Sequence, residues 1–254
     1  MHYNTLLTAA LCTTRLLRSY NLHHAFFGGF ATTSLGCRRE TKDLDILVQT
    51  NKATLTSLLN GNKDWLEVQQ GRDDYVAYLW KGCGEANMVL VEFFFFKAGK
   101  DGMQQASFPQ IQPFTHYKTS ATLPLLSPWH LFLGKLSATA GREKETDLAD
   151  LLFLLSLYPA EIERGLRSAR LGSRNAVALG RMFTAKSSSA VLDRRDRVEV
   201  QQMLAGAGRK WPELRLALAR VGVKGTRSGK QHPTACAPRA LRLECGAVQR
   251  GLVC

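Results

Sequence analysis

The 254-residue sequence predicts an α/β (α+β) fold, in which a mixed β-sheet is flanked by helices. Two observations carry this prediction. Apolar and polar residues alternate over Asp43–Val48, Trp65–Val68 and Tyr75–Trp80, and the dense apolar run Met88–Phe96 is typical of a buried strand. Segments with helical periodicity lie before, between and after these strands. Together they favour one sheet with helices packed on it.

The other elements of the first half follow in chain order. We expect a first helix over residues 5–20, an apolar run at Ala25–Phe27 that leads into a glycine turn, and a helix over Lys52–Leu59. Residues 98–118 are rich in Gly and Gln and contain two prolines, so we expect a long surface loop there.

Two helices are expected after this loop. Ser127 and Pro128 supply a cap and a first position for a helix that runs through Thr139. A second helix covers Glu145–Leu157, with leucines along one side. We expect both helices to pack on the sheet, which places a core domain at residues 1–158.

The last third of the chain differs in composition. Short helices are expected at residues 160–169, 198–205 and 212–221, and they make residues 159–221 a small basic helical lobe. Residues 222–254 have no clear apolar period, so we expect a disordered tail.

A glycine pair and two acids form the most informative pattern. Gly28 and Gly29 follow an apolar run, and glycines at such a turn bring backbone N–H groups close to a phosphate. Asp43 and Asp45 stand two apart on a strand, so both project from one face and could bind one divalent ion. A simple turn and a solvated acid pair are the alternatives for each motif alone.

Glu92 is the third acid of this pattern. It is the one charged residue within the apolar run Met88–Phe96, and burying an unpaired carboxylate costs several kcal/mol. We therefore expect it to be neutralised, paired or bound to a metal ion. The alternative is a carboxylate at the strand edge that pairs with Lys or Arg.

These residues resemble the nucleotidyltransferase superfamily with a polymerase-β-like core. The stretch from Gly28-Gly29 to Asp43-Leu44-Asp45 is similar to the form G-G-x-A…R-x-T-x-D-x-D of its small stand-alone members, which include abortive-infection-type toxins and fungal relatives. A second segment, from Leu125 to Leu152, looks like the family's helical K-L…R…K-x-x-D-x-x-D-L element. The resemblance covers roughly residues 5–155.

The resemblance implies roles for single residues. Asp43, Asp45 and Glu92 would be the catalytic and metal-binding acids, although many relatives carry Asp where this chain has Glu92. The residues implied to bind the nucleotide are Gly28, Gly29, Arg39, Thr41 and Lys135.

Several of these positions have a structural alternative. Lys135 would otherwise be a solvated helix lysine. Asp147 and Asp150 match the family element but stand at i, i+3 of a helix, where Arg142 and Lys144 could pair with them.

The function that this implies is transfer of a nucleoside monophosphate from an NTP, such as ATP, to a hydroxyl acceptor, with release of pyrophosphate. Two Mg²⁺ or Mn²⁺ ions would serve as cofactors. The acceptor, which the sequence does not identify, would be an RNA, a protein or a small molecule. The alternative function is an inactive nucleotide- or nucleic-acid-binding protein with the same fold.

The charge is unevenly distributed. Residues 1–160 contain 15 Lys and Arg against 14 Asp and Glu, whereas residues 161–254 contain 19 against 7. This basic C-terminal region could attract nucleic acid electrostatically, or it could be a solvated face.

Cysteine usage and hydropathy bear on the setting of the protein. The six cysteines form no C-x-x-C pair, so we expect free thiols, no structural zinc and a cytoplasmic setting, with the nucleus as the alternative. The sequence has no apolar run long enough to span a membrane, so we expect no membrane partner.

Overall fold

The computed structural model describes residues 3–72, 74–82, 84–96, 108–116, 120–141 and 144–168. These residues belong to one unit of the chain, Met1–Lys224. The helices expected at residues 198–205 and 212–221 and the tail from residue 222 lie outside the described residues.

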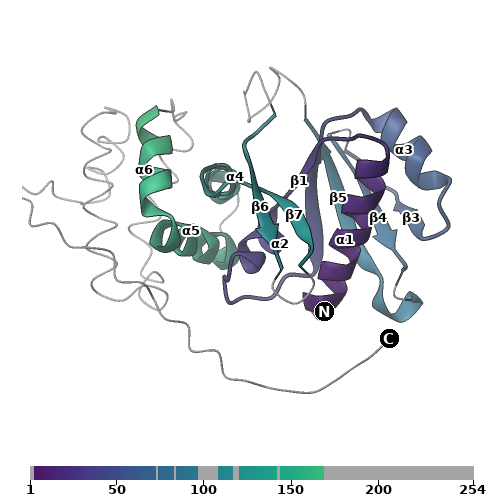
Figure 1. The fold of residues 1–254 in the computed structure, drawn as a ribbon, viewed down its shortest axis with the longest axis horizontal. Helices are drawn as coiled ribbons and strands as arrows, with labels where there is room; N and C mark the ends of the chain where they lie inside the picture. The colour runs from purple at the N-terminus through teal and green to yellow at the C-terminus, as the bar shows by residue number, and fades with distance from the viewer. Residues whose placement is uncertain are drawn as a thin grey trace, which may run out of the picture. The chain divides into compact units, whose positions relative to one another are not determined.

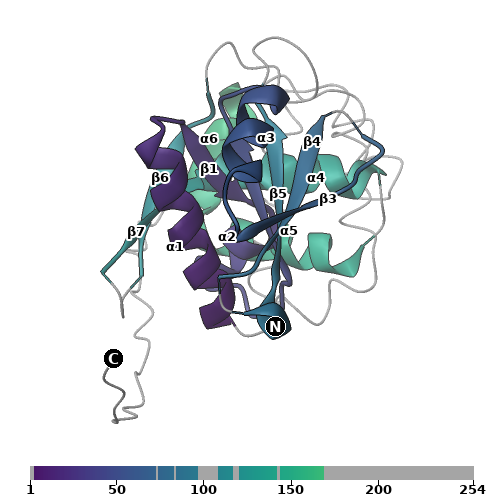
Figure 2. The ribbon, with the colours of Figure 1, turned by 90° about the vertical axis from the view of Figure 1, so that its right-hand side faces the viewer.

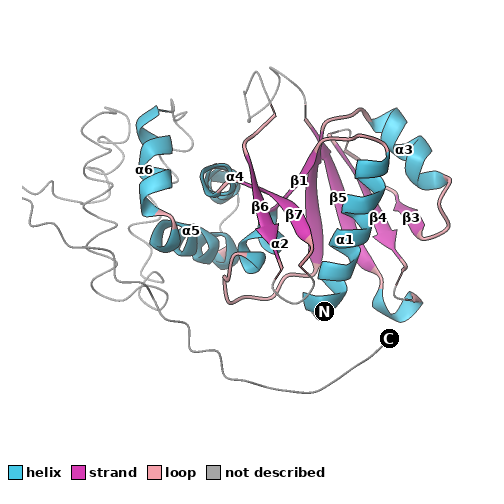
Figure 3. Cartoon of the chain, in the orientation of Figure 1, coloured by secondary structure: helices cyan, strands magenta, loops and turns pink. Residues whose placement is uncertain are grey.

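The described residues form a mixed seven-stranded sheet (Figure 3), which confirms the predicted fold class. Its strand order is β3-β4-β5-β2-β1-β7-β6. Two pairs are parallel, β2 with β5 and β1 with β7, and the other neighbours are antiparallel. The strands are β1 His24–Phe27, β2 Asp43–Val48, β3 Trp65–Val68, β4 Tyr75–Trp80, β5 Val89–Phe95, β6 Ile111–Thr115 and β7 Thr122–Leu126.

Helices cover both faces of this sheet (Figures 1 and 2). Helices α1 and α3 lie on one face. On the other face α4 contacts β7, and α5 and α6 pack against α4, so the expected contact of residues 145–157 is made mainly with helices rather than with the sheet. The short α2 follows β1 directly and contacts β1, β2, α4 and α5. The helices are α1 Tyr3–Ser19, α2 Gly28–Ser34, α3 Lys52–Asn60, α4 Pro128–Gly141, α5 Glu145–Leu157 and α6 Pro159–Ser168, with a 3-10 turn, η1, at Glu85–Asn87.

The strand alternation read from the sequence explains which faces are buried. Along β2, Leu44, Ile46 and Val48 are fully buried, while Asp43 and Asp45 are partly exposed. The core continues into α1 and α3 through leucines such as Leu17 and Leu55, which are also fully buried. One face of the sheet is therefore dry, and the acids project from the other face.

The predicted surface loop at residues 98–118 is wrong for its last part, because Ile111–Thr115 forms the edge strand β6. The prolines suggested a loop, but an edge strand tolerates a residue without an N–H, and Pro113 lies opposite Pro124 of β7. Strand β7 was not predicted either. It pairs in parallel with β1 and carries the buried Leu123 and Leu125.

The helical expectations agree with the structure to within one or two residues at most ends. Helix α6 packs against α4 and α5, and its Ile162 is fully buried in the core. The boundary placed between residues 158 and 159 remains a prediction. Among the described residues, no helix is both long and apolar enough to cross a membrane.

Candidate active site

The strand register brings the three predicted acids together at one end of the sheet. Asp43 and Asp45 project from the same face of β2, and β5 lies beside β2 in parallel with Glu92 directly opposite Asp45. A hydrogen bond links the Asp45 and Glu92 side chains. Residues 47 positions apart in the chain thus form one acidic cluster, with Asp45 at its centre.

The glycine turn meets this cluster from the other side. Phe27, the last residue of β1, pairs with Asp45, and the chain turns at Gly28 with φ +66° to begin α2. A Cβ on Gly28 would lie 1.8 Å from Oδ2 of Asp45. The absence of a side chain here lets the backbone pass directly over the carboxylate.

Gly29 makes a second close approach. A Cβ at this position would lie 2.4 Å from Nη2 of Arg39 and 2.7 Å from Oγ1 of Thr41. The Thr41 hydroxyl donates a hydrogen bond of 3.1 Å to Oδ1 of Asp43. Four of the predicted site residues therefore lie in one small volume, at which the start of α2 and the segment before β2 converge.

The electrostatics of the cluster centre on Asp45. Burial, followed by the negative charges of Asp43 and Glu92, raises the pKa of Asp45 to about 7. Lys135 opposes this shift. The cluster is therefore a concentrated negative charge, and either a proton or a cation would relieve it.

The donor set suits a hard divalent cation. In the described part of the chain, no three His, Cys, Asp or Glu side chains already stand in a metal-binding arrangement. Mg²⁺ does not need one, because it commonly takes only one or two protein carboxylates and completes its shell with waters and substrate phosphates. Three partly exposed carboxylates, crowded enough that the pKa of Asp45 is raised, fit an ion of this kind.

Lys135 lies within a buried network of charged side chains. Its Nζ is 2.9 Å from Oδ1 of Asp147 and 2.7 Å from Oδ2 of Asp150. Arg39 makes a two-pronged contact with Asp150, with Nε at 2.7 Å and Nη2 at 2.8 Å. Lys135 is thus a buried, paired lysine, and the alternative of a solvated helix lysine is wrong.

This network contains residues for which another role, or none, was predicted. Asp147 and Asp150 pair with Lys135 and Arg39, whereas a pairing with Arg142 and Lys144 was the sequence-based alternative. Thr32, which also donates to Asp150, was not singled out at all. A Thr one turn after a glycine pair carries no recognisable signal in a single sequence.

Cys37 lies beside the same carboxylate. Its Sγ is 3.6 Å from Oδ1 of Asp150, and burial, followed by the negative charge of Asp150, raises the pKa of the thiol to about 11. Cys37 is therefore a poor nucleophile at neutral pH. Within the described residues, Cys12 and Cys37 form no disulfide.

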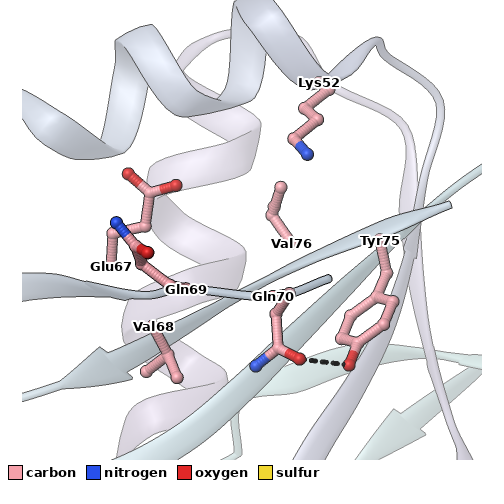
Figure 4. A pocket seen from close by; sticks show the side chains of 7 residues that line it. All are labelled: Lys52, Glu67, Val68, Gln69, Gln70, Tyr75 and Val76. Carbon is pink, nitrogen blue, oxygen red and sulfur yellow. Dashed lines mark hydrogen bonds between the residues drawn. The ribbon is translucent and has the colours of Figure 1, made fainter. Parts of the chain in front are cut away.

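A separate hollow of about 150 Å³ lies where β3, β4 and the start of α3 come together (Figure 4). Lys52, Glu67, Gln70 and Tyr75 are among its lining residues, and Tyr75 donates a hydrogen bond to Gln70. None of the predicted site residues lines this hollow.

Comparison with known proteins gives matches among solved structures alone. No family model matches the sequence, and no curated protein matches it. An antigenic nucleotidyltransferase-like protein from Paracoccidioides brasiliensis is similar at 21% identity, over 85% of this chain and 93% of that chain, with a TM-score of 0.46.

Two bacterial structures are also similar. MenT4, a nucleotidyltransferase toxin from Mycobacterium tuberculosis, matches at 16% identity over 85% of this chain and 91% of that chain, with a TM-score of 0.45. JHP933 from Helicobacter pylori matches at 16% identity over 84% and 91%, with a TM-score of 0.41. The chain is thus similar to nucleotidyltransferase-like structures.

Proposed function

We propose that the protein is a metal-dependent nucleotidyltransferase, which moves a nucleoside monophosphate from an NTP to a hydroxyl acceptor. One observation carries the proposal: the Gly28 turn and Glu92 flank the same carboxylate, that of Asp45, from opposite sides. A phosphate-accepting turn and a set of acids at one point on a sheet are the parts that phosphoryl chemistry requires.

The reaction forms one bond to the α-phosphorus and breaks another. The acceptor oxygen forms a bond to the α-phosphorus of the NTP, and the bond from that phosphorus to the bridging oxygen breaks, so that pyrophosphate leaves. The hydroxyl proton passes to a carboxylate and then to solvent. Glu92, on the strand beyond Asp45, is the carboxylate that we assign to this proton.

The residues around the acids hold the nucleotide. The backbone N–H groups of Gly28 and Gly29, at the start of α2, would donate to a phosphate of the nucleotide, while Thr41 donates a hydrogen bond to one oxygen of Asp43. Asp43, Asp45 and Glu92 would hold Mg²⁺ or Mn²⁺, which when bound lowers the pKa of the attacking hydroxyl and stabilises charge on the phosphate oxygens.

The experiment that tests this function is a labelling reaction. Purified protein is incubated with each α-³²P-labelled NTP, Mg²⁺ or Mn²⁺, and a mixture of cellular RNA and protein. The matched control is the double variant Asp43→Asn, Asp45→Asn, which keeps the shape of both side chains and removes their charge. We expect transfer of label by the wild type and none by the variant.

Either outcome is informative. The class of molecule that carries the label identifies the acceptor as RNA, protein or neither, and a small-molecule acceptor would be recovered in the soluble fraction. If the wild type binds NTP in a metal-dependent way but transfers no label to any fraction, the enzyme assignment is wrong and the site is a nucleotide-binding site.

A further inference from the structure

The Asp150 carboxylate contacts donor groups on four residues. Its side chain is fully buried, and its two oxygens accept from Thr32 Oγ1 at 2.9 Å, from Nε and Nη2 of Arg39 at 2.7 and 2.8 Å, and from Lys135 Nζ at 2.7 Å. The Cys37 thiol adds a weak contact at 3.6 Å. A buried charge is tolerated only with such compensation.

These donors come from three different parts of the fold. Thr32 lies on α2, Cys37 and Arg39 lie in the irregular segment between α2 and β2, and Lys135 lies on α4. Asp150 itself lies on α5, 111 positions after Arg39 in the chain. One carboxylate therefore ties the segment at residues 37–42 to the helical layer.

That segment leads directly into the candidate active site. The Arg39 guanidinium lies against Gly29, where it would be 2.4 Å from a Cβ, and the Arg39 carbonyl accepts a hydrogen bond from Thr33 at 3.4 Å. Two residues later, Thr41 donates to the carboxylate of Asp43. The position of Arg39 thus sets where the chain enters β2.

We propose that Asp150 is a positioning residue: by holding Arg39 with two parallel hydrogen bonds, it fixes residues 37–42 and so orients Thr41 and the Asp43 carboxylate. The guanidinium and the carboxylate are both planar groups, and two parallel hydrogen bonds between them fix the orientation of the arginine side chain as well as its distance. The effect on nucleotide and cation rests on the proposed function, whereas the effect on the segment does not.

The chain offers a matched control on the same helix. Asp147 shares Lys135 with Asp150, is equally buried and lies one turn earlier, whereas the contacts with Arg39, Thr32 and Cys37 are made by Asp150. Asp147→Asn and Asp150→Asn therefore each remove one charge next to Lys135, but Asp150→Asn also removes the two-pronged contact with Arg39.

The first measurement is amide hydrogen exchange in the full-length variants. We expect Asp150→Asn to speed exchange over residues 37–42 by roughly tenfold or more, and Asp147→Asn to leave this segment within about twofold of the wild type. Equal exchange of the segment in both variants would overturn the positioning role.

The second measurement is the affinity for Mn²⁺ in the presence of a non-hydrolysable NTP. Changing a residue that orients a metal ligand typically weakens affinity by about 10- to 100-fold, so we expect a loss in this range for Asp150→Asn and a clearly smaller loss for Asp147→Asn. If the wild type binds neither Mn²⁺ nor the nucleotide, the proposed function fails, and hydrogen exchange still decides the role of Asp150.

A second variant covers the case in which Asp150→Asn does not fold. Arg39→Lys keeps the charge of the pair but loses the two-pronged geometry, so we expect it to speed exchange over residues 37–42 as well. An unchanged segment in a folded Arg39→Lys variant would contradict the proposal.

Discussion

The carboxylate of Asp45 occupies the space into which a side chain at Gly28 would project. The closest distance, 1.8 Å from the ideal Cβ position to Oδ2, is shorter than any non-bonded contact. Gly28 also has φ +66°, a conformation that costs other residues energy. The turn and the acid therefore fit together only because residue 28 has no side chain.

Gly28→Ala should abolish nucleotidyl transfer, because the new methyl group must displace the Asp45 carboxylate. The matched control is Gly84→Ala, at φ +83°, where a Cβ would meet no described atom within 4 Å apart from its chain neighbours. Both changes carry a backbone penalty of about 1–3 kcal/mol in the free energy of unfolding. Urea denaturation and label transfer, measured on both variants, should show a loss of stability in both, larger for Gly28→Ala because of the added steric clash, but a loss of transfer in Gly28→Ala alone.

Gly29→Ala tests the second close approach. Its methyl group would meet Nη2 of Arg39 at 2.4 Å, and Asp150 prevents the guanidinium from moving aside. We expect a loss of about 1–3 kcal/mol in the free energy of unfolding, as is typical of overpacking.

The control for this variant is Gly134→Ala, in the interior of α4, where a Cβ would meet no described atom within 4 Å outside the backbone of its own helix. Alanine is the better helix former, so this variant should gain about 0.5–1 kcal/mol. Thermal unfolding of the two variants checks both signs, and a Gly29→Ala protein as stable as the wild type would contradict the observed packing.

Gly165→Ala tests how α6 packs on α4. A Cβ at residue 165 would lie 2.2 Å from Cδ2 of Trp129, whose backbone N–H donates to Glu161 at 3.3 Å. Although alanine favours a helix, we expect this variant to lose about 1–3 kcal/mol of stability. Trp129→Leu should reduce that loss in a double-mutant cycle, and additive losses would show that the two residues do not touch.

The sequence predicted those strands whose own hydropathy pattern shows which of their side chains are buried. Strand β2 alternates and β5 is continuously apolar, so both were predicted close to their observed limits. Strand β6 was not, because Pro113 and its polar neighbours resemble a loop until β7 is beside them. Its identity as a strand depends on a tertiary partner, which local composition does not reveal.

The candidate site likewise combines features that the local sequence reveals with features that depend on tertiary contacts. The spacing of Asp43 and Asp45 on one strand, and the glycine pair nearby, were visible in the sequence. The register that sets Glu92 opposite Asp45 was not, because alternation defines the face of a strand but not its neighbour. The Arg39–Asp150 pair was equally hidden, since nothing local joins residues 111 positions apart.

The raised pKa of Asp45 predicts an unusual dependence of stability on pH. In the folded protein without a cation this pKa is about 7, whereas in the unfolded chain it is about 3.9. Between these values the folded state binds more protons than the unfolded state, so the free energy of unfolding falls as the pH rises from about 4 to 7. Asp45→Asn removes this contribution because an amide does not titrate in that range.

In EDTA, Asp45→Asn should therefore be more stable than the wild type at pH 8, by on the order of 1–2 kcal/mol, and the difference should shrink at pH 5. With Mg²⁺ at pH 8, the wild type should instead be more stable than Asp45→Asn. The ion relieves the repulsion that Asp43 and Glu92 exert on Asp45, and this repulsion exists only in the wild type, where Asp45 is charged. Thermal unfolding of both proteins at the two pH values, with EDTA and with Mg²⁺, measures all of these differences. A stability gap that is the same at pH 5 and pH 8 would mean that Asp45 titrates normally, and that its carboxylate does not share a site with the other two acids.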